Sequence, residues 1–499
     1  MIIYSPSKYY TPEKEEDRNC GLSPIVMRAL RARGIVTDED RQRFLYPDYS
    51  LLRDPFLLPD MQKAVDRIEQ AVFDGESICI YGDYDVDGIC ATTMLLHYLL
   101  SIGAEATYKI PSRQDDGYGI SRKAIDNLHA SGVSLIITVD NGISAYQEIA
   151  YANRLGIDVI VTDHHIPPEN IPECVAVVCH SVEGGEYPRY LCGAGTALKL
   201  IQALGGVEAA EPYLNLAGVA TVADVVPLLD ENRFFVKCAL EAMNNGRCCL
   251  GLNMLLESLP NARKPYSAFN IGFGVAPRLN AAGRMGDASL CVELFMTEDP
   301  EVASDIIAEL SRLNELRQAE EQAILSEAVE MVERMDVSRM HAILLASDSW
   351  NSGVIGIAAS RLTEIYHRPA ILFSEYDGAL KGSARSVEGI NIHDALKAHS
   401  DMFIRFGGHA KAAGVTMEKD MFPEFAAAFE EYLAANCPAE LFVPRRCYEF
   451  DEELSSIDIE LASQLELLAP FGEGNPRPLF AINDLKPTGA LLFGSEKQY

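Results

Sequence analysis

Alternation between apolar runs and helical patterns over residues 77–178 constrains the fold of this chain more than any other feature. Four runs rich in β-branched residues occur there, at 77–81 (SICIY), 133–139 (VSLIITV), 157–162 (IDVIVT) and 174–178 (CVAVV). The first run is followed by GICATTMLLHYLL, whose length and apolar content are typical of a buried helix. Strands that alternate with helices predict βαβ units, so we expect an α/β fold with a parallel sheet.

The pattern changes over residues 301–336, where one long helix is expected. Apolar residues recur there at near-helical spacing, and no glycine or proline interrupts the stretch 301–335. Such a helix is either a simple surface helix or a rigid connector between two lobes, and the sequence leaves both interpretations open. Two further apolar runs, HAILLAS and RPAILFSE, then predict a second α/β lobe.

These patterns divide the chain into five parts. The polar N-terminal part carries a short helical candidate at 24–33. The last part has short candidate strands and breaks off at LLFGSEKQY, either because the sequence is truncated or because this module is degenerate. The expected parts are an N-terminal segment (1–55), a parallel-sheet domain (56–300), a connecting helix (301–336), a second lobe (337–437) and a partial β module (443–499).

Composition excludes several classes of protein. With 48% hydrophobic and 23% charged residues over 499 positions, the chain is typical of a folded enzyme rather than of a disordered or fibrous protein. No apolar run approaches the ~18 residues of a membrane-spanning helix, and the N-terminus lacks the basic and apolar regions of a signal peptide. Twelve cysteines without a CxxC pair favour reduced thiols and a cytoplasmic location.

The net charge of −31 restricts how this chain can bind nucleic acid. Proteins that coat nucleic acids without sequence preference usually do so through a basic surface that displaces counterions from the phosphates. This chain cannot do so over its whole surface. Any contact with nucleic acid therefore requires local cations, either arginines in a groove or bound metal ions.

Acidic residues follow three of the predicted strands at the point where each strand ends. In an open parallel sheet the carboxyl ends of the strands meet at one edge, where ligands bind. Two adjacent histidines and one more acid join this set. The candidates are Asp83, Asp85 and Asp87 after the first strand, Asp140 after the second, Asp163 with His164 and His165 after the third, and Asp224 in VATVADVVPL.

Each candidate also has an ordinary structural interpretation. A single aspartate before a helix is often an N-cap, an aspartate at a strand end is often a turn residue, and paired histidines in a loop often face solvent. The set as a whole favours another interpretation, since carboxylates crowded at one sheet edge repel one another unless divalent cations lie among them. The sequence therefore predicts a metal centre.

The ligand types indicate which metal and which reaction to expect. Carboxylate and imidazole ligands without thiolate favour Mn²⁺, with Mg²⁺ as a substitute. The candidate ligands are too many for one ion, so we expect two ions. A pair of cations about 3.5–4 Å apart activates water and stabilises in-line displacement at phosphorus. The residues therefore indicate phosphoester hydrolysis.

Several motifs resemble those of the DHH phosphoesterases, and within that superfamily those of its single-strand-specific exonucleases. They are GDYDVDG, VDNG, TDHH and ATVADVVPL around the acidic residues, PSRQDDGYG and APRLNAAGRM in the same domain, and SGVIGIAASRL and GGHAKAAG in the second lobe. The resemblance extends along nearly the whole chain. It implies a DHH domain, a DHH-associated domain and a C-terminal module that resembles the start of an OB fold.

The resemblance also implies a role for each acidic candidate. Asp163 completes the triplet after which the superfamily is named, and it is expected to be catalytic together with His165 and the supporting acid Asp83. Many relatives carry histidine where this chain has Tyr81, and a neutral phenol is a poor ligand, so one ion is expected to bind more weakly here. The matched metal ligands are Asp85, Asp87, Asp140, His164, His165 and Asp224.

Glycine-rich turns and arginines supply candidates for substrate binding. Taken singly, such turns are ordinary connections, but their backbone N–H groups can approach a phosphate closely, and arginine can bind it in bidentate fashion. The resemblance implies a terminal-phosphate pocket at Ser383, Arg385, Gly407, Gly408 and His409, a groove for the nucleic-acid backbone at Arg113, Arg278 and Arg284, and base stacking on Tyr118.

The implied function is degradation of single-stranded DNA from the 5′ end to mononucleotides in repair and recombination. A second hypothesis keeps the chemistry but limits the substrate to short oligonucleotides, cyclic dinucleotides or pyrophosphate. A third is a non-enzymatic replication scaffold, whose sign would be lost acids, and this chain retains them. The implied partners are single-stranded DNA and a helicase or single-strand-binding protein, and the chain is expected to be a monomer that does not bind membranes.

Overall fold

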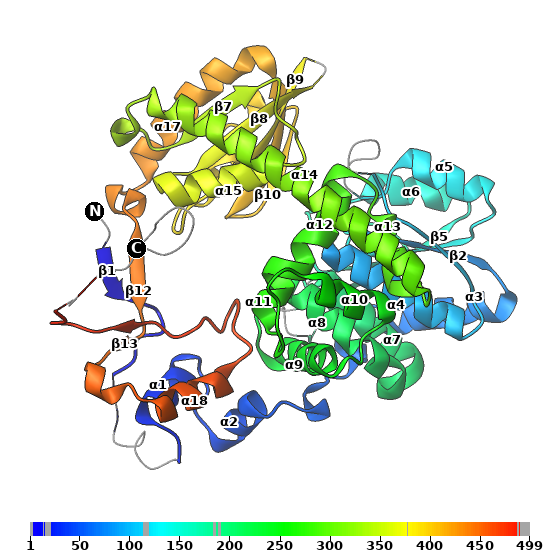
Figure 1. The fold of residues 1–499 in the computed structure, drawn as a ribbon. Coiled ribbons are helices and arrows are strands. Elements are labelled where there is room, and N and C mark those ends of the chain that lie inside the picture. Colours follow the sequence, from blue (N-terminus) through cyan, green and yellow to red (C-terminus); the bar gives the residue numbers. More distant parts are fainter. Residues whose placement is uncertain are drawn as a thin grey trace.

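The computed structural model describes residues 3–12, 14, 21–112, 119–182, 186–187, 191–376, 378–486 and 489. Two α/β lobes and a smaller unit built from the two ends of the chain make up the molecule (Figure 1). The predicted α/β class with a parallel sheet is confirmed. In the described ranges, no helix combines the length and the apolar character needed to cross a membrane.

The first lobe is built on a five-stranded parallel sheet with strand order β3-β2-β4-β5-β6. From β2 the chain adds β3 on one side of the sheet and then β4 on the other, so the strand order reverses between β2 and β4. In open α/β sheets, ligands bind at the carboxyl ends of the strands beside such a reversal. The strands are β2 (Ser77–Tyr81), β3 (Glu105–Lys109), β4 (Leu135–Val139), β5 (Asp158–Asp163) and β6 (Ala176–Cys179).

Side chains of the central strands alternate between two buried apolar clusters. In β2, Ile78 and Ile80 pack with α4 and α7, whereas Cys79 and Tyr81 pack with α5 and α6 on the other face. Burial on both faces explains why these strands appear in the sequence as continuous apolar runs. The edge strand β3 has the sequence EATYK, in which exposed and half-buried residues alternate, so apolar runs do not predict it.

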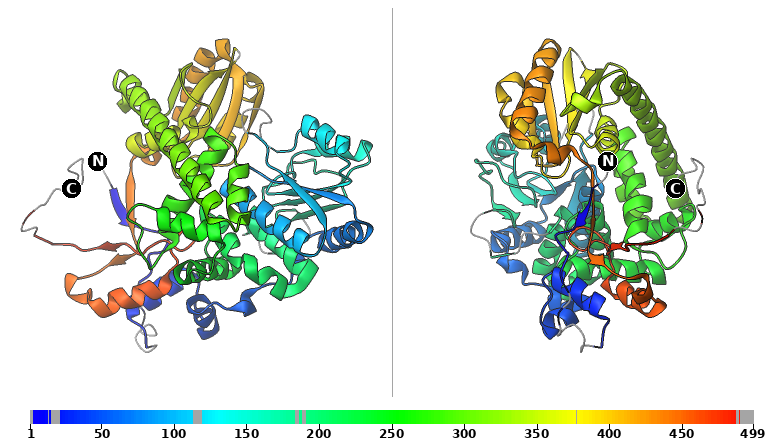
Figure 2. Two further views of the ribbon diagram at one scale, coloured as in Figure 1. Left: turned by 45° about the vertical axis from the view of Figure 1, so that its right-hand side comes forward. Right: turned by 90° about the vertical axis from the view of Figure 1, so that its left-hand side faces the viewer.

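Helices cover both faces of this sheet and extend the lobe beyond it (Figures 1 and 2). A π-helical turn, Ile271–Val275, continues α11 into α12. The helices are α3 (Met61–Asp74), α4 (Val86–Ser101), α5 (Arg122–Ala130), α6 (Tyr146–Arg154), α7 (Gly193–Ala210), α8 (Leu214–Ala223), α9 (Asp230–Asn245), α10 (Leu250–Ser258), α11 (Ala268–Asn270), α12 (Ala276–Met285) and α13 (Ser289–Met296).

The long helix α14 (Pro300–Glu333) joins the two lobes (Figure 1). Its 34 residues make it about 50 Å long. Its first half buries Ile306 and Leu310 in the apolar cluster of the first lobe. Its second half buries Ile324 and Val332 against the second lobe. Of the two interpretations that the sequence left open, the connector is therefore correct.

The second lobe has a mixed sheet with strand order β10-β11-β9-β8-β7, in which β7 and β8 are parallel and the other pairs antiparallel. One face packs on α15, and the other packs on α16 and α17. The elements are β7 (Ile343–Ser347), α15 (Ile355–Tyr366), β8 (Ala370–Tyr376), β9 (Ala379–Arg385), α16 (Ile392–Lys397), β10 (Arg405–Gly408), β11 (Ala412–Glu418) and α17 (Phe422–Asn436).

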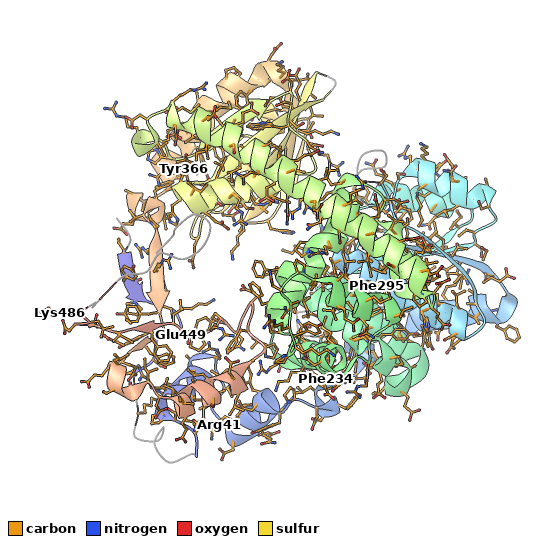
Figure 3. All side chains as sticks on the ribbon, in the orientation of Figure 1. Arg41, Phe234, Phe295, Tyr366, Glu449 and Lys486 are labelled. Atoms are coloured by element: carbon orange, nitrogen blue, oxygen red, sulfur yellow. The ribbon has the colours of Figure 1, made fainter. Side chains whose placement is uncertain are left out.

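The two ends of the chain fold together into a third unit, which Figure 2 shows from two further sides. Helices from the N-terminal segment share an apolar cluster with residues from the C-terminal segment. The buried side chains of Arg33 and Glu449, of which Figure 3 labels Glu449, form an ion pair (3.0 Å) between the two segments. The elements are β1 (Ile3–Pro6), α1 (Pro24–Ala32), α2 (Asp38–Leu45), β12 (Arg445–Tyr448), β13 (Phe450–Asp451), α18 (Ile459–Leu465) and β14 (Phe480–Ala481).

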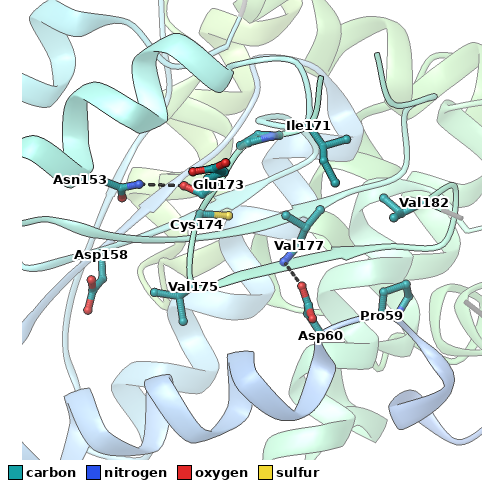
Figure 4. A pocket seen from close by; sticks show the side chains of 11 residues that line it. Pro59, Asp60, Asn153, Asp158, Ile171, Glu173, Cys174, Val175, Val177 and Val182 are labelled. Atoms are coloured by element: carbon teal, nitrogen blue, oxygen red, sulfur yellow. Dashed lines mark hydrogen bonds between the residues drawn. The ribbon is translucent and has the colours of Figure 1, made fainter. Parts of the chain in front are cut away.

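A cavity of about 710 Å³ lies beside the edge strand β6 (Figure 4). Its polar side chains hold the surrounding backbone in place. Asp60 Oδ2 accepts the N–H of Val177 (3.2 Å), and Asn153 Nδ2 donates to the carbonyl of Glu173 (2.8 Å). These contacts occupy backbone groups at an edge that could otherwise pair with another chain. The two hydrogen bonds in the wall of this cavity therefore stabilise the backbone at the sheet edge.

Candidate active site

The acidic residues of the first lobe converge where β2, β4 and β5 end. His164 lies at the centre of the cluster, with its Nε2 3.2 Å from Asp140 Oδ1, 3.7 Å from Asp87 Oδ2 and 3.8 Å from Asp224 Oδ2. Three groups of potential metal ligands each have their atoms within 4.8 Å of one another; His164 belongs to the first and second groups, and Asp140 to the first and third. The groups are Asp140–His164–His165, Asp87–His164–Asp224 and Asp83–Asp85–Asp140.

The loop after β2 takes its shape from the start of α4. Asp85 Oδ1 caps this helix by accepting the N–H groups of Asp87 (2.9 Å) and Gly88 (3.2 Å). The N-cap interpretation is therefore correct for Asp85, and these bonds engage only one of its two oxygens. A Cβ atom at position 88 would lie 2.6 Å from backbone atoms of Asp83, so only glycine allows the loop to fold back on itself.

Asp87 is held by the N-terminus of a second helix. Its carboxylate oxygens accept the N–H groups of Gly193 (2.6 Å) and Ala194 (2.7 Å), the first residues of α7. Free N–H groups and the helix dipole make this end a favourable place for a carboxylate. A Cβ atom at position 193 would lie 2.5 Å from Asp140 Cβ, so the glycine also lets α7 approach Asp140. The sequence signal for this contact is the small-residue run GAG that opens an apolar helix.

Asp163 lies behind the two histidines and fixes their positions. Its Oδ1 accepts the Nδ1–H of His165 (2.7 Å) and the backbone N–H groups of His164 (2.7 Å) and His165 (3.2 Å). Its Oδ2 accepts the N–H of Ile143 (3.0 Å). Burial favours a raised pKa for Asp163, but the hydrogen bond and charge of His165 outweigh burial and lower the pKa. This carboxylate is therefore charged and orients the His165 ring.

Helix α12, which carries the motif APRLNAAGRM, supports the loop after β2 from the other side. Asn280 Oδ1 accepts the N–H of Val86 (3.2 Å). A Cβ atom at position 283 would lie 2.3 Å from the carbonyl oxygen of Tyr84, so Gly283 permits close packing of the helix on the loop. These two contacts give the motif a structural role that the sequence alone did not indicate.

The arginines of the same helix make contacts with backbone carbonyls. Arg284 Nη1 donates to the carbonyl of Gly353 (2.9 Å) in the second lobe, just before α15. Arg278 Nη1 donates to the carbonyl of Gly274 (2.9 Å), and burial lowers the pKa of Arg278. Arg284 thus links the two lobes. A contact of either residue with the nucleic-acid backbone stays a prediction.

In the second lobe, Ser383 and Arg385 lie side by side on β9. Arg385 Nη1 donates to Ser383 Oγ (3.0 Å) and to the carbonyl of Ala384 (2.8 Å). Both side chains lie at the N-terminus of α15, because a Cβ atom at position 356 would be 2.7 Å from Ser383 Oγ and 2.8 Å from Arg385 Nη2. A hydroxyl, a guanidinium and the N–H groups of a helix N-terminus together form a favourable site for an anion.

The hairpin between β10 and β11 extends this anion site toward the acidic cluster of the first lobe. Gly407 pairs with Gly414, which in turn pairs with Ser383, so these residues form one row across three strands. Gly408 has a φ of +141°, which favours glycine, and it is followed by His409, whose N–H donates to Ala412 (2.7 Å). Burial lowers the pKa of His409, and the charge of His165 lowers it further. His409 therefore lies within electrostatic range of the first-lobe cluster.

The sequence singled out three further residues, Arg113, Tyr118 and Tyr81. Arg113 and Tyr118 lie outside the described residues, so their predicted roles stay predictions. Tyr81 is buried against the face of the sheet that α5 and α6 cover, and its hydroxyl donates to the carbonyl of Gly119 (3.3 Å). The expectation of one weaker metal ion stays a prediction as well.

Three segments of the chain match known families of domains. Residues 77–223 match the DHH family, N-terminal domain. Residues 336–435 match the DHHA1 domain, and residues 449–499 match the RecJ OB domain. The single-stranded-DNA-specific exonuclease RecJ of Escherichia coli is 33% identical over 94% of this chain and 85% of its own length. The chain belongs to the RecJ family.

Other members of the RecJ family agree with this assignment. RecJ of Bacillus subtilis is 39% identical over 96% of the chain, and the chain spans 61% of the length of that relative. The crystal structure of Thermus thermophilus RecJ in complex with Mn²⁺ is 32% identical, with a TM-score of 0.83 over 96% of this chain and 69% of that one. A second structure of the same protein contains Mg²⁺ and has a TM-score of 0.77. The resemblance to this family of the DHH superfamily is thus confirmed.

The acidic cluster fits divalent cations on chemical grounds. Burial and the neighbouring Asp87 raise the pKa of Asp85, and burial together with the surrounding carboxylates raises the pKa of Asp140 well above its usual value. The same causes raise the pKa of Asp224 to about 9. Within the described part of the chain, Asp140 Oδ1 is buried and accepts no hydrogen bond. A cation would supply the missing partner and reverse the repulsion.

We expect binding of Mn²⁺ to release protons at pH 7. Asp140 and Asp224 have raised pKa values and hold protons without metal, whereas a carboxylate must be ionised to act as a ligand. Calorimetric titration in two buffers with different ionisation enthalpies measures the protons released. The Asp224→Asn variant should release fewer protons than the wild type. Equal heats in both buffers for the wild type would contradict these protonation states.

Proposed function

We propose that this chain is a metal-dependent exonuclease that degrades single-stranded DNA from the 5′ end to mononucleotides, in DNA repair and recombination. The observation that carries the proposal is the pairing of two sites across the lobes. The first lobe has a cluster of carboxylates and imidazoles, and the second has an anion site whose His409 is within electrostatic range of that cluster. The relatives from E. coli and B. subtilis bear the name of single-stranded-DNA-specific exonucleases.

The proposal includes two divalent cations, Mn²⁺ with Mg²⁺ as a substitute. The RecJ structures from T. thermophilus contain one or the other of these ions. His164 links the first ligand group to the second and Asp140 links the first to the third, so the groups are contiguous and suit two neighbouring cations. When bound, the cations activate the attacking water and neutralise charge at the phosphate. The residues that would hold them are the predicted ligands Asp85, Asp87, Asp140, His164, His165 and Asp224; the third ligand group adds Asp83, which the sequence indicated only as a supporting acid.

The remaining residues of the site would bind and orient the substrate. Asp163 holds His165 Nδ1, which directs the other ring nitrogen away from Asp163. Asp163 thus acts as a positioning residue in this proposal. Ser383 and Arg385 would bind the terminal 5′ phosphate, with His409 and the glycines before it closing the pocket. Binding of the chain end in one lobe then determines which phosphodiester lies at the metals of the other.

The charge of the protein is consistent with a single-stranded substrate. A net charge of −31 repels nucleic acid from most of the surface, so binding depends on the metal cluster and on a few arginines. A duplex has more charge per unit length and would be repelled more strongly. The competing hypothesis of a short substrate has the same chemistry. The segments that match the DHHA1 domain and the RecJ OB domain favour the longer substrate, because they offer it additional binding surface.

Other parts of the proposal rest on the family and on composition. We propose domain limits at 1–55, 56–300, 301–336, 337–437 and 443–499. We also propose that the chain acts as a monomer in the cytoplasm, with a helicase or a single-strand-binding protein as partner.

Asp224→Asn should abolish hydrolysis while the protein stays folded. Asp224 belongs to one of the ligand groups and lies at the end of α8, and the amide is isosteric but cannot replace a charged ligand. Digestion of 5′- and 3′-labelled single strands with Mn²⁺, beside a duplex control, measures activity, and thermal melting measures folding. The matched control is Asp305→Asn on the exposed side of α14, which should retain wild-type rates. Wild-type turnover by Asp224→Asn would contradict the proposed metal centre.

Arg385→Ala should impair cleavage of 5′-phosphorylated strands much more than cleavage of 5′-hydroxyl strands. A charge-assisted hydrogen bond contributes about 1.5–3 kcal/mol, which corresponds to about a ten- to hundred-fold change in affinity. Initial rates on both substrates give the comparison, and Mn²⁺ titration checks that metal binding is unchanged. The control is Arg361→Ala, an exposed arginine in the middle of α15 that pairs with Glu364. An equal loss on both substrates would mean that Arg385 is a general backbone contact.

A further inference from the structure

A second hollow lies between the first lobe and the C-terminal segment, next to Asp224 of the acidic cluster. Its volume is about 820 Å³, and it lies between the end of α8, the segment from α11 into the π-helical turn, and the C-terminal segment 466–477. Its lining includes Ala223 and Val225, which are the residues before and after Asp224, so the hollow starts next to Asp224. Figure 1 shows α8, α9 and α11 on the side of the first lobe next to the C-terminal unit. We call this hollow the aromatic pocket.

Two exposed phenylalanines line the aromatic pocket. Phe269 and Phe273 are 67% and 73% exposed, and their rings stack with centroids 4.7 Å apart and an angle of 26°. They are four residues apart on a continuous helical segment, so their ring faces lie on one side of it. Most large apolar side chains of this chain are buried, and burying such a ring is favourable. A stacked, exposed pair beside an acidic site therefore suggests a ligand with a flat apolar face.

The opposite wall of the aromatic pocket is fixed in place by the C-terminal segment. The N–H of Leu228 donates to the carbonyl of Glu473 (2.8 Å), and a Cβ atom at position 472 would lie 2.7 Å from Leu228. Phe471 lies on this wall with the guanidinium of Arg477 4.7 Å from its ring centroid. Arg477 also pairs with Glu466 (3.1 Å), and Glu473 gives this rim one more negative than positive charge. The pocket thus suits neutral ring faces better than phosphates.

We propose that the aromatic pocket binds bases of single-stranded DNA on the 3′ side of the phosphodiester that is cleaved. This inference rests on the proposed function and extends it to a further binding site. If the 5′ phosphate occupies the second lobe and the scissile bond lies at the metals, the rest of the strand must leave along the first lobe. The aromatic pocket begins at the residues that flank Asp224, so it lies at the start of that path. Stacking on aromatic rings accepts any base, as a nuclease without sequence preference requires.

The test compares long and short substrates. Loss of base stacking costs about 1–3 kcal/mol per base, or about a five- to hundred-fold change in affinity. The measured quantity is kcat/KM on a 5′-phosphorylated 12-mer divided by kcat/KM on a 5′-phosphorylated dinucleotide. In the Phe269→Ala/Phe273→Ala variant this ratio should be at least about fivefold lower than in the wild type. Phe269→Trp/Phe273→Trp should retain the wild-type ratio, because tryptophan also stacks.

A fluorescent base provides a direct readout. 2-Aminopurine placed at successive positions of the 12-mer should be quenched at positions near the 5′ end on the wild type, and the quenching should be lost on the alanine variant. The matched control is Phe73→Ala, which removes an 86% exposed phenylalanine from α3 and should leave both rates and quenching unchanged. Thermal melting checks that each variant is folded.

The outcomes separate this inference from the proposed function. If the wild type cleaves neither substrate with Mn²⁺, the proposed function fails. If the wild type cleaves both and the alanine variant keeps the wild-type ratio and quenching, the function stands and the aromatic pocket does not bind DNA. That result would leave the exposed rings as a contact for another protein.

Discussion

Repulsion between buried carboxylates at one edge of the first sheet is the constraint on which the rest of this structure depends. Asp83, Asp87, Asp140 and Asp163 are each at most 3% exposed, although charged groups in such places are costly. Hydrogen bonds reduce this cost for some of the carboxylates and not for others. Asp87 receives two N–H groups from α7, and Asp163 receives four hydrogen bonds, whereas Asp140 and Asp224 keep raised pKa values. The carboxylates that lack such partners are the ones that cations would stabilise most.

Contacts between the two lobes hold the anion site of the second lobe near this edge of the first sheet. Helix α14 is buried in both lobes, and Arg284 reaches from α12 to the carbonyl before α15. The second lobe then presents Ser383 and Arg385 on β9 and His409 on the adjacent hairpin. A hydrolase that acts from a chain end needs such an arrangement, because the distance between the end-binding site and the reacting site sets the length of the product.

Sequence patterns predicted the parts of the fold that depend on local periodicity. The run 77–81 coincides with β2, and the acids after three strands do meet at one edge, because parallel strands bring their carboxyl ends together. Strand β3 was missed because an edge strand need not be apolar. The packing of the N-terminal helices on the C-terminal segment was missed because it joins residues more than 400 positions apart, for which a single sequence has no periodic signal.

For the site, the sequence predicted which residues lie close together but not which of them lie behind the others. TDHH gives no indication that Asp163 lies behind the histidines, because that depends on N–H groups of the folded loop. The support of Asp87 by α7 depends on a helix more than 100 residues further along the chain. Phe269 and Phe273 were not singled out, since an i, i+4 aromatic pair is usually part of a core, and only the fold leaves this pair exposed.

We propose that the carboxylate–imidazole cluster is a two-cation centre. Anomalous diffraction from crystals of this protein grown with Mn²⁺, measured at the manganese absorption edge, tests it most directly. Two neighbouring peaks are expected within the cluster, in contact with Asp140 and His164, each of which belongs to two of the three ligand groups. A map with no manganese at this sheet edge, or with a single ion there, would contradict a two-cation centre.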